Sequence, residues 1–145
     1  MVVEPRIQEQ QCGFRPGRGT TDQLFFLQQV IETTWEFVQP VYASFVDLEK
    51  AYDQVPRDLL WLALHEYGND GQLLAAIQSL YSECRSCIRL DGRKSGWFGV
   101  NVGLRQGCVL SPLLSLVFMD RISRRSSSSE GLKVGNVELK STFCR

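Results

Sequence analysis

A short, nearly uninterrupted apolar run at residues 41–48 constrains the fold of this chain more than any other feature. The run follows Pro40, is rich in β-branched and aromatic residues, and contains a single charged residue, Asp47. Such a pattern is typical of a strand that is covered on both faces. We therefore expect a buried strand that ends in a fixed carboxylate.

A carboxylate at the end of a buried strand suits metal-dependent chemistry, because the strand fixes the ligand and its neighbours exclude water. Magnesium prefers a few hard oxygen ligands and completes its shell with substrate phosphates. Nucleotidyl transfer by two metals needs carboxylates that hold two cations roughly 3.5–4 Å apart. The structural alternative is an aspartate that ends a strand and caps the next turn. From the strand alone, this alternative is favoured for Asp47.

A second block, Gly103-Leu-Arg-Gln-Gly-Cys-Val-Leu-Ser-Pro112, predicts a glycine turn that leads into a helix. Gly107 has no Cβ and would allow another group to approach the backbone closely. Ser111 and Pro112 are a typical N-cap and first-turn residue for a helix that runs to about Arg124. A glycine turn before a capped helix is common, so this block alone is weak evidence of function.

The other predicted elements give an α+β fold, a sheet backed by helices. Apolar residues recur at helical spacing from Thr20 until Pro40, and helices are expected over 56–67 and 70–81. Two hairpins are expected, one with strands 85–90 and 97–102 joined through 91–96, the other with strands 132–134 and 137–139. The helix after Ser111 should turn one stripe inward: Leu113, Leu114, Val117, Phe118 and Ile122.

Together, the segment Phe45-Val-Asp-Leu-Glu-Lys-Ala-Tyr-Asp53 and the Gly103–Pro112 block resemble two blocks of the reverse transcriptase palm in non-LTR (LINE-type) retrotransposons. The resemblance begins at Gln11-Cys-Gly-Phe-Arg-Pro-Gly-Arg18, and the three blocks occur in the order of that family. It implies a partial fingers-palm of a right-hand polymerase, with an antiparallel palm sheet backed by helices. Residues 1–40 would be fingers-like and 41–145 a partial palm, without a thumb.

The resemblance also implies roles for individual residues in RNA-directed DNA synthesis with Mg²⁺ and deoxynucleoside triphosphates. Asp47 would be a catalytic metal ligand, and Gln106 and Gly107 would lie against the incoming nucleotide. Tyr52 would close off the 2′ side of the sugar, where a ring clashes with the hydroxyl that distinguishes RNA from DNA precursors. The alternative for Tyr52 is a half-buried packing aromatic. Asp53 is expected to cap the turn that follows it rather than to bind metal.

Two arginines in the 11–18 loop, Arg15 and Arg18, resemble fingers arginines that hold the triphosphate through charge-assisted hydrogen bonds. Their alternative is a pair of solvated loop arginines. The residues alone do not separate the two interpretations.

Two basic clusters are candidates for contacts with an RNA template or a DNA primer. One lies on the first predicted hairpin, where only Asp91 opposes its four cations: Arg85, Arg89, Arg93 and Lys94. The other ends the helix after Ser111, where cations also favourably oppose the helix dipole: Arg121, Arg124 and Arg125. Because the net formal charge is zero, binding should be weak and should depend on local patches.

Cysteine content and hydropathy indicate where the chain would reside. Five cysteines, an odd number without framework spacing, favour reduced thiols in an intracellular protein, cytoplasmic or nuclear. Cys84 and Cys87 could be half of a zinc site, but a structural site needs four ligands and the single histidine is His65. No apolar run approaches 18 residues, so no contact with a membrane is expected.

A third block, an aromatic followed by Ala-Asp-Asp, is implied by the resemblance but is not found. Phe143-Cys144-Arg145 stand where that block would begin. The expected catalytic site is therefore incomplete, and synthesis by this chain alone is not expected. The competing interpretation is a non-enzymatic product, either a relic of a retroelement or a retained RNA- or protein-binding module.

Overall fold

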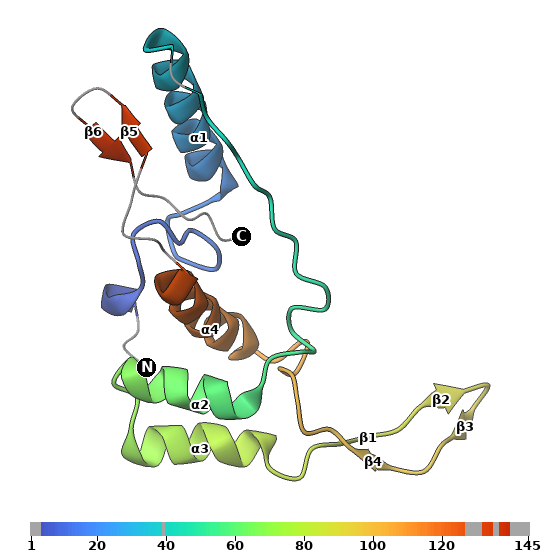
Figure 1. The fold of residues 1–145 in the computed structure, drawn as a ribbon. Coiled ribbons are helices and arrows are strands. Elements are labelled where there is room, and N and C mark those ends of the chain that lie inside the picture. The colour runs from blue at the N-terminus through green and yellow to red at the C-terminus, as the bar shows by residue number, and fades with distance from the viewer. Residues whose placement is uncertain (1–3, 39, 127–131, 135–136, 140–145) are drawn as a thin grey trace. The chain divides into compact units, whose positions relative to one another are not determined.

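The fold was examined in a computed structural model, which describes residues 4–38, 40–126, 132–134 and 137–139 (Figure 1). The chain divides into two compact units. The described residues of one unit are Lys50–Phe118, here called the central unit. The other combines Glu4–Glu49 with Met119–Arg145 and is here called the split unit. The proposed boundary between a fingers-like segment and a palm at residues 40 and 41 stays a prediction.

Helices form where the sequence predicts them. The helices are α1 (Thr20–Glu36), α2 (Arg57–Glu66), α3 (Gly71–Tyr81) and α4 (Ser111–Ser126), with a short 3-10 turn η1 (Glu4–Arg6). Gly68, the expected stop after α2, has φ +76°, a conformation that favours glycine. Asp70 precedes α3 at the N-cap position, but its carboxylate lies 3.3 Å from His65 Nε2 and caps no N–H.

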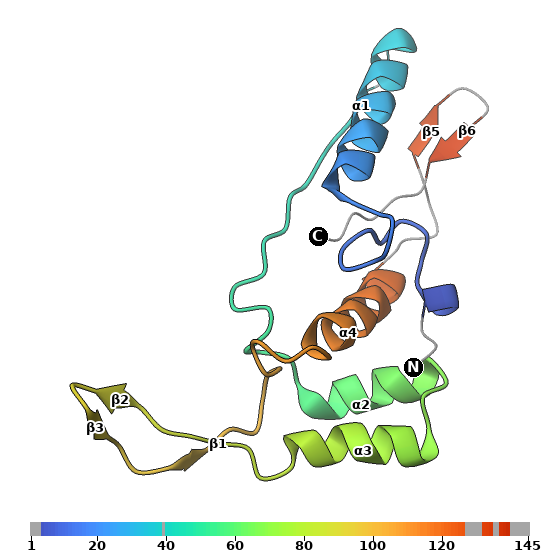
Figure 2. The ribbon, with the colours of Figure 1, turned by 180° about the vertical axis from the view of Figure 1, so that it is seen from behind.

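The core of the central unit lies between α2, α3 and the first half of α4. Its fully buried side chains include Leu60 and Leu64 of α2 and Leu114 and Val117 of α4. α2 and α3 run side by side in both views, and the ribbon that contains β1 to β4 projects beyond them (Figures 1 and 2). The predicted stripe on α4 is wrong at Ile122, which is 40% exposed.

Six short strands lie within the described residues, and they form three separate antiparallel pairs. The first hairpin contains β1 (Arg85–Ser86) with β4 (Phe98–Gly99) and β2 (Arg89–Leu90) with β3 (Arg93–Lys94), and the last pairs β5 (Leu132–Val134) with β6 (Val137–Leu139). The tip of the first hairpin is the two-residue turn Asp91-Gly92 with φ +47° and +77°, not the six-residue loop expected. Both strands of the last hairpin are confirmed, and its Gly135-Asn136 turn lies outside the described residues.

The predicted buried strand at residues 41–48 is wrong. This segment forms no strand, and Tyr42, Phe45 and Val46 are 80% or more exposed. A strand needs a partner to satisfy its backbone, and none of the described strands pairs with this segment. The mixed helix and antiparallel-strand composition fits an α+β fold, but the described strands do not join into one sheet.

Candidate functional site

Two sequence blocks that lie far apart in the chain meet in the central unit. The Gly103 N–H donates to the Val55 carbonyl at 2.9 Å, and the Leu104 N–H donates to the Tyr52 carbonyl at 2.8 Å. These bonds place the turn around Gln106 against the segment that follows Asp47. The structure therefore brings together Tyr52 and the Gly103 block, as expected of blocks that form one site.

Gly103 permits this close approach. It has φ +81°, and a Cβ at this position would lie 2.6 Å from the Asp53 carbonyl oxygen and 2.9 Å from its Cα. A side chain there would force the backbone to shift. Gly107 has the same φ of +81° but has nothing within 4 Å of its Cβ position. The space beside Gly107 is therefore open, as a residue that lets a ligand approach the backbone requires.

Gln106 is exposed and donates from Nε2 to Asp53 Oδ1 at 3.0 Å. The expectation that Asp53 caps the following turn is wrong, because α2 begins after Pro56 and has no side-chain cap. The 103–106 segment lies within reach of the Asp53 carboxylate because backbone bonds hold it there. Tyr52, beside Asp53, is half-buried, so the structure is compatible with a packing role or a gate role for its ring.

Arg57 was not singled out from the sequence, yet it holds this arrangement together. Its guanidinium donates to the carbonyls of Gly103 at 3.1 Å, Tyr81 at 3.1 Å, Val100 at 2.8 Å and Val102 at 3.3 Å. It also lies 5.0 Å from the centre of the Tyr81 ring. A cation in the first turn of a helix is repelled by the positive end of the helix dipole. This unfavourable position of Arg57 was the signal in the sequence that it has a tertiary role.

Arg105 and Ser111 fix the two ends of the Gln106 turn. Arg105 donates to the Cys84 sulfur at 3.1 Å, and this hydrogen bond raises the pKa of Arg105, which stays charged. Its guanidinium lies 5.8 Å from the centre of the Tyr81 ring. The buried Ser111 hydroxyl donates to the Arg105 carbonyl at 2.5 Å, so Ser111 ties down the turn and the expected N-cap bond is wrong.

Asp47 belongs to the split unit and lies in the exposed 41–48 segment. Within the described ranges, no group of three or more His, Cys, Asp or Glu side chains is placed to hold a metal ion. The role of Asp47 as a metal ligand therefore stays a prediction. The buried carboxylate of the split unit is Asp120, which accepts the Gln8 N–H at 2.9 Å and pairs with Arg124 at 2.8 Å.

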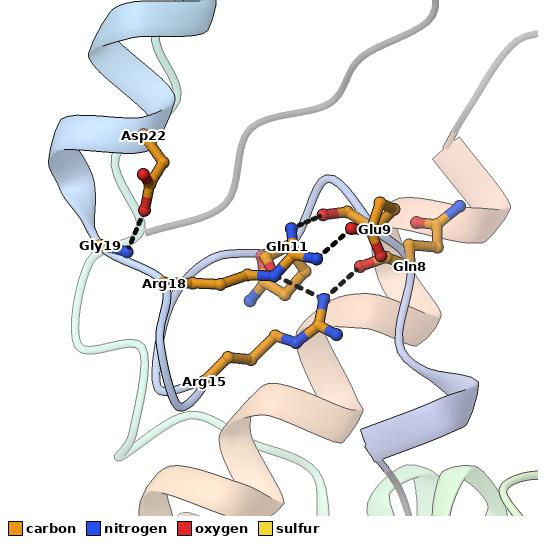
Figure 3. Close-up of polar contacts among 7 residues, drawn as sticks. All are labelled: Gln8, Glu9, Gln11, Arg15, Arg18, Gly19 and Asp22. Carbon is orange, nitrogen blue, oxygen red and sulfur yellow. Dashed lines mark hydrogen bonds and ion pairs between the residues drawn. The ribbon is translucent and has the colours of Figure 1, made fainter.

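Arg15 and Arg18 close the loop of the split unit that precedes α1 (Figure 3). Arg15 donates to the carbonyls of Gln8 at 2.9 Å and Gln11 at 3.0 Å. Arg18 donates to the Glu9 carbonyl at 2.8 Å and forms an ion pair with the Glu9 carboxylate. Triphosphate binding by either arginine stays a prediction, and it would require phosphate oxygens to replace these acceptors.

The basic hairpin, defined here as residues 85–99, presents its cations to solvent. Arg85, Arg89, Arg93 and Lys94 are all exposed, and within the described part of the chain none of their side chains forms a hydrogen bond or an ion pair. Arg89 lies directly opposite Lys94 in the ladder. Like charges opposite each other are destabilising, so an anion bound between them would relieve a repulsion. Trp97, 66% exposed, adds an aromatic surface to the same ribbon.

The second basic cluster, at the end of α4, differs from the hairpin in the contacts of its side chains. Arg124 pairs with Asp120, and Arg121 is buried. These two arginines are engaged within the protein, which favours the structural interpretation of the cluster. Arg124 and Arg125 are exposed, and Arg124 is nevertheless held by its ion pair with Asp120.

Comparison with known proteins identifies the family to which these blocks belong. The model of the family described as "Reverse transcriptase (RNA-dependent DNA polymerase)" matches residues 1–139. The chain belongs to the reverse transcriptase family. The match covers both blocks of the central unit and the arginine-containing loop of the split unit, and it confirms the resemblance drawn from the sequence.

Relatives of this reverse transcriptase segment come from retrotransposons. The chain is 30% identical over 126 residues to the Pol polyprotein of the type-2 retrotransposable element R2DM of Drosophila melanogaster, covering 87% of this chain and 12% of that protein. It is 31% identical over 117 residues to the RNA-directed DNA polymerase of the mobile element jockey of Drosophila melanogaster, covering 80% of this chain and 13% of that protein. The chain is thus part of a non-LTR reverse transcriptase domain and spans about an eighth of these relatives.

No helix among the described residues is long and apolar enough to cross a membrane.

A pair of glycine substitutions tests the junction of the two blocks. Gly103→Ala should lower the free energy of unfolding by about 2 kcal/mol or more, because it adds a clash with Asp53 to the strain of a positive φ. Gly107→Ala is the matched control, since it has the same φ and an open Cβ position. Urea denaturation of both variants would measure the difference. Equal losses would show that Gly103 is not needed for the close approach.

Titration of Glu9 tests the ion pair in the arginine loop. The hydrogen bond from Arg18, and next its charge, lower the pKa of Glu9 below 4.5. The pair therefore stabilises the fold above the unfolded pKa and loses this contribution as the pH falls through the lower folded pKa. Arg18→Gln should raise the pKa of Glu9, measured by NMR, whereas Arg15→Gln should raise it less. No change in the Arg18 variant would contradict the pairing.

Proposed function

We propose that this chain supplies part of the nucleotide-binding surface of a non-LTR reverse transcriptase, in the fingers and palm of a right-hand polymerase. The reaction would be RNA-directed DNA synthesis from deoxynucleoside triphosphates, with an RNA template and a DNA primer. The observation that carries the proposal is the junction of the Tyr52 segment with the Gly103 block, which places Gln106 against Asp53 and is followed by Gly107, whose Cβ position is open.

In this proposal each side chain of the junction acts on a different part of the nucleotide. Gln106 offers an amide to hydrogen-bond the incoming nucleotide, and Gly107 lets the nucleotide approach the backbone. The Tyr52 ring limits the space at the 2′ carbon of the sugar. Arg15 and Arg18 would bind the triphosphate after exchanging their present carbonyl and carboxylate acceptors for phosphate oxygens.

Magnesium chemistry requires more ligands than the described residues bring together. The described side chains contain no cluster of three or more groups that could hold the ion. They do not by themselves form a two-metal site. Asp47 would contribute one ligand to a complete enzyme.

The basic hairpin supports a second part of the proposal, contact with the template and primer. Unpaired arginines and a lysine attract phosphates, and the exposed Trp97 offers a stacking surface to an unpaired base. The same surface would serve a module that binds nucleic acid without synthesis. Measurements of primer extension and of nucleic-acid binding distinguish a polymerase from a module that only binds nucleic acid.

A chimera tests the enzymatic function. The segment of the jockey polymerase that matches this chain would be replaced by the corresponding residues of this chain, and primer extension on an RNA template would be measured. We expect synthesis, and we expect Asp47→Ala to lower its rate by about a thousandfold, equivalent to ~4 kcal/mol of transition-state stabilisation. A folded chimera that binds primer and template but does not extend them would favour the non-enzymatic module.

The Tyr52 gate is tested in the same chimera. Tyr52→Val should raise the relative kcat/KM for ribonucleotides by about tenfold or more, because the variant removes the ring that excludes the 2′-hydroxyl. Tyr52→Phe keeps the ring and should preserve discrimination. If the valine variant discriminates as the tyrosine enzyme does, Tyr52 is a packing residue.

Salt dependence tests the basic hairpin in the intact chain. Fluorescence anisotropy with an RNA–DNA hybrid should show weak binding that falls steeply as salt rises. The double variant Arg89→Gln, Lys94→Gln should reduce the slope of log K against log salt by about 1.4–1.8, since each phosphate contact contributes about 0.7–0.9. Arg125→Gln, a cation outside the hairpin, is the control. Tight, salt-insensitive binding would argue against a surface of this kind.

A further inference from the structure

Asp53 and Gln106 form a hydrogen-bonded pair on the exposed side of the junction between the two blocks. The pair joins residues 53 positions apart, at 3.0 Å between Gln106 Nε2 and Asp53 Oδ1. Both side chains are exposed, whereas Gly103, Leu104 and Val55 beneath them are buried. A buried backbone framework therefore carries a polar pair that faces outward.

The chemistry of the two groups dictates which end of the amide meets Asp53. An ionised carboxylate only accepts hydrogen bonds, and a glutamine amide has a donor nitrogen and an acceptor oxygen. With the nitrogen on Asp53, the Gln106 oxygen is left as an outward acceptor. The reverse orientation would place two acceptors against each other and is disfavoured.

The backbone framework fixes the position of Asp53 independently of its carboxylate. The Asp53 carbonyl and Cα lie against Gly103, and backbone bonds on either side join Leu104 to Tyr52 and Gly103 to Val55. Asp53 is therefore held in place before its side chain makes any bond. Its carboxylate is then available to orient a partner rather than to hold the loop.

We propose that Asp53 is a positioning residue that orients the side-chain amide of Gln106, so that Oε1 is presented as an acceptor to a donor group of the incoming nucleotide. The use made of that acceptor rests on the proposed function. The orientation itself is a property of the chain alone. The orientation of Gln106 would contribute to specificity. Its Oε1 acceptor would favour a ligand with a hydrogen-bond donor at this position and disfavour a ligand with an acceptor there.

NMR of the intact 145-residue chain tests the orientation without any polymerase activity. The two side-chain amide protons of Gln106 should differ from those of Gln72, an exposed glutamine of α3 without a side-chain partner among the described residues. Asp53→Ala should abolish that difference. Asp58→Asn, which alters another exposed carboxylate of the central unit, should preserve it. In both variants, exchange protection of the Gly103 and Leu104 amides should be retained.

An exchange of donor and acceptor completes the test. Gln106→Glu alone should break the pair because two carboxylates then face each other. Adding Asp53→Asn should restore a bond with reversed polarity, seen as shifted side-chain amide protons of the new asparagine. Gln106 protons that match Gln72 in the unmodified chain, or that stay shifted in Asp53→Ala, would overturn the proposal. Loss of Gly103 and Leu104 protection in Asp53→Ala would overturn it too, because Asp53 would then hold the loop.

These measurements need no DNA synthesis, so they test the orientation of Gln106 separately from the proposed polymerase function. An inactive chimera with an intact Asp53–Gln106 pair would count against the proposed function alone. An active chimera without the pair would count against the orientation alone.

Discussion

The close approach of Gly103 to Asp53 is the constraint on which the rest of the central unit depends. Two backbone segments can lie so near each other only if one of them lacks a Cβ, and Gly103 also adopts a φ that other residues resist. Arg57 then gathers four carbonyls around this contact, so groups that would otherwise lack partners are satisfied by one charged donor. The result is a closely held backbone beneath an exposed edge.

The proposed nucleotide-binding role needs a well-held backbone beneath an exposed edge. Gln106 and Asp53 reach solvent, and the position beside Gly107 is open, while the neighbouring Ser111 and Tyr81 are buried. The basic hairpin differs from the junction around Gln106. Its strands are short, its charges are unpaired and repel across the ladder, and its large side chains are exposed. If the hairpin binds a polyanion, as proposed, neutralisation of these charges would stabilise the ribbon.

Several elements could be predicted from local pattern alone. The helix from Thr20, the stop at Gly68 and the paired strands 132–134 and 137–139 follow from spacing and from turn residues, which act over a few positions. The resemblance to reverse transcriptases could also be recognised from the sequence, because it rests on the order of short sequence blocks. The 41–48 segment was misjudged for a physical reason. An apolar, β-branched run has the composition of a strand, but it becomes one only when a partner supplies hydrogen bonds.

The sequence by itself determined the family and the helices, since these depend on residue type and near neighbours. Only the tertiary structure decided how the residues are used. It assigned Asp53 to Gln106 rather than to a helix cap, Ser111 to the Arg105 carbonyl, and Arg57 to the junction. Each of these partners lies 6 to 53 positions away. Hydrogen-bond donors and acceptors are common along any chain, and only the packed backbone selects which of them come within 3 Å or so of each other.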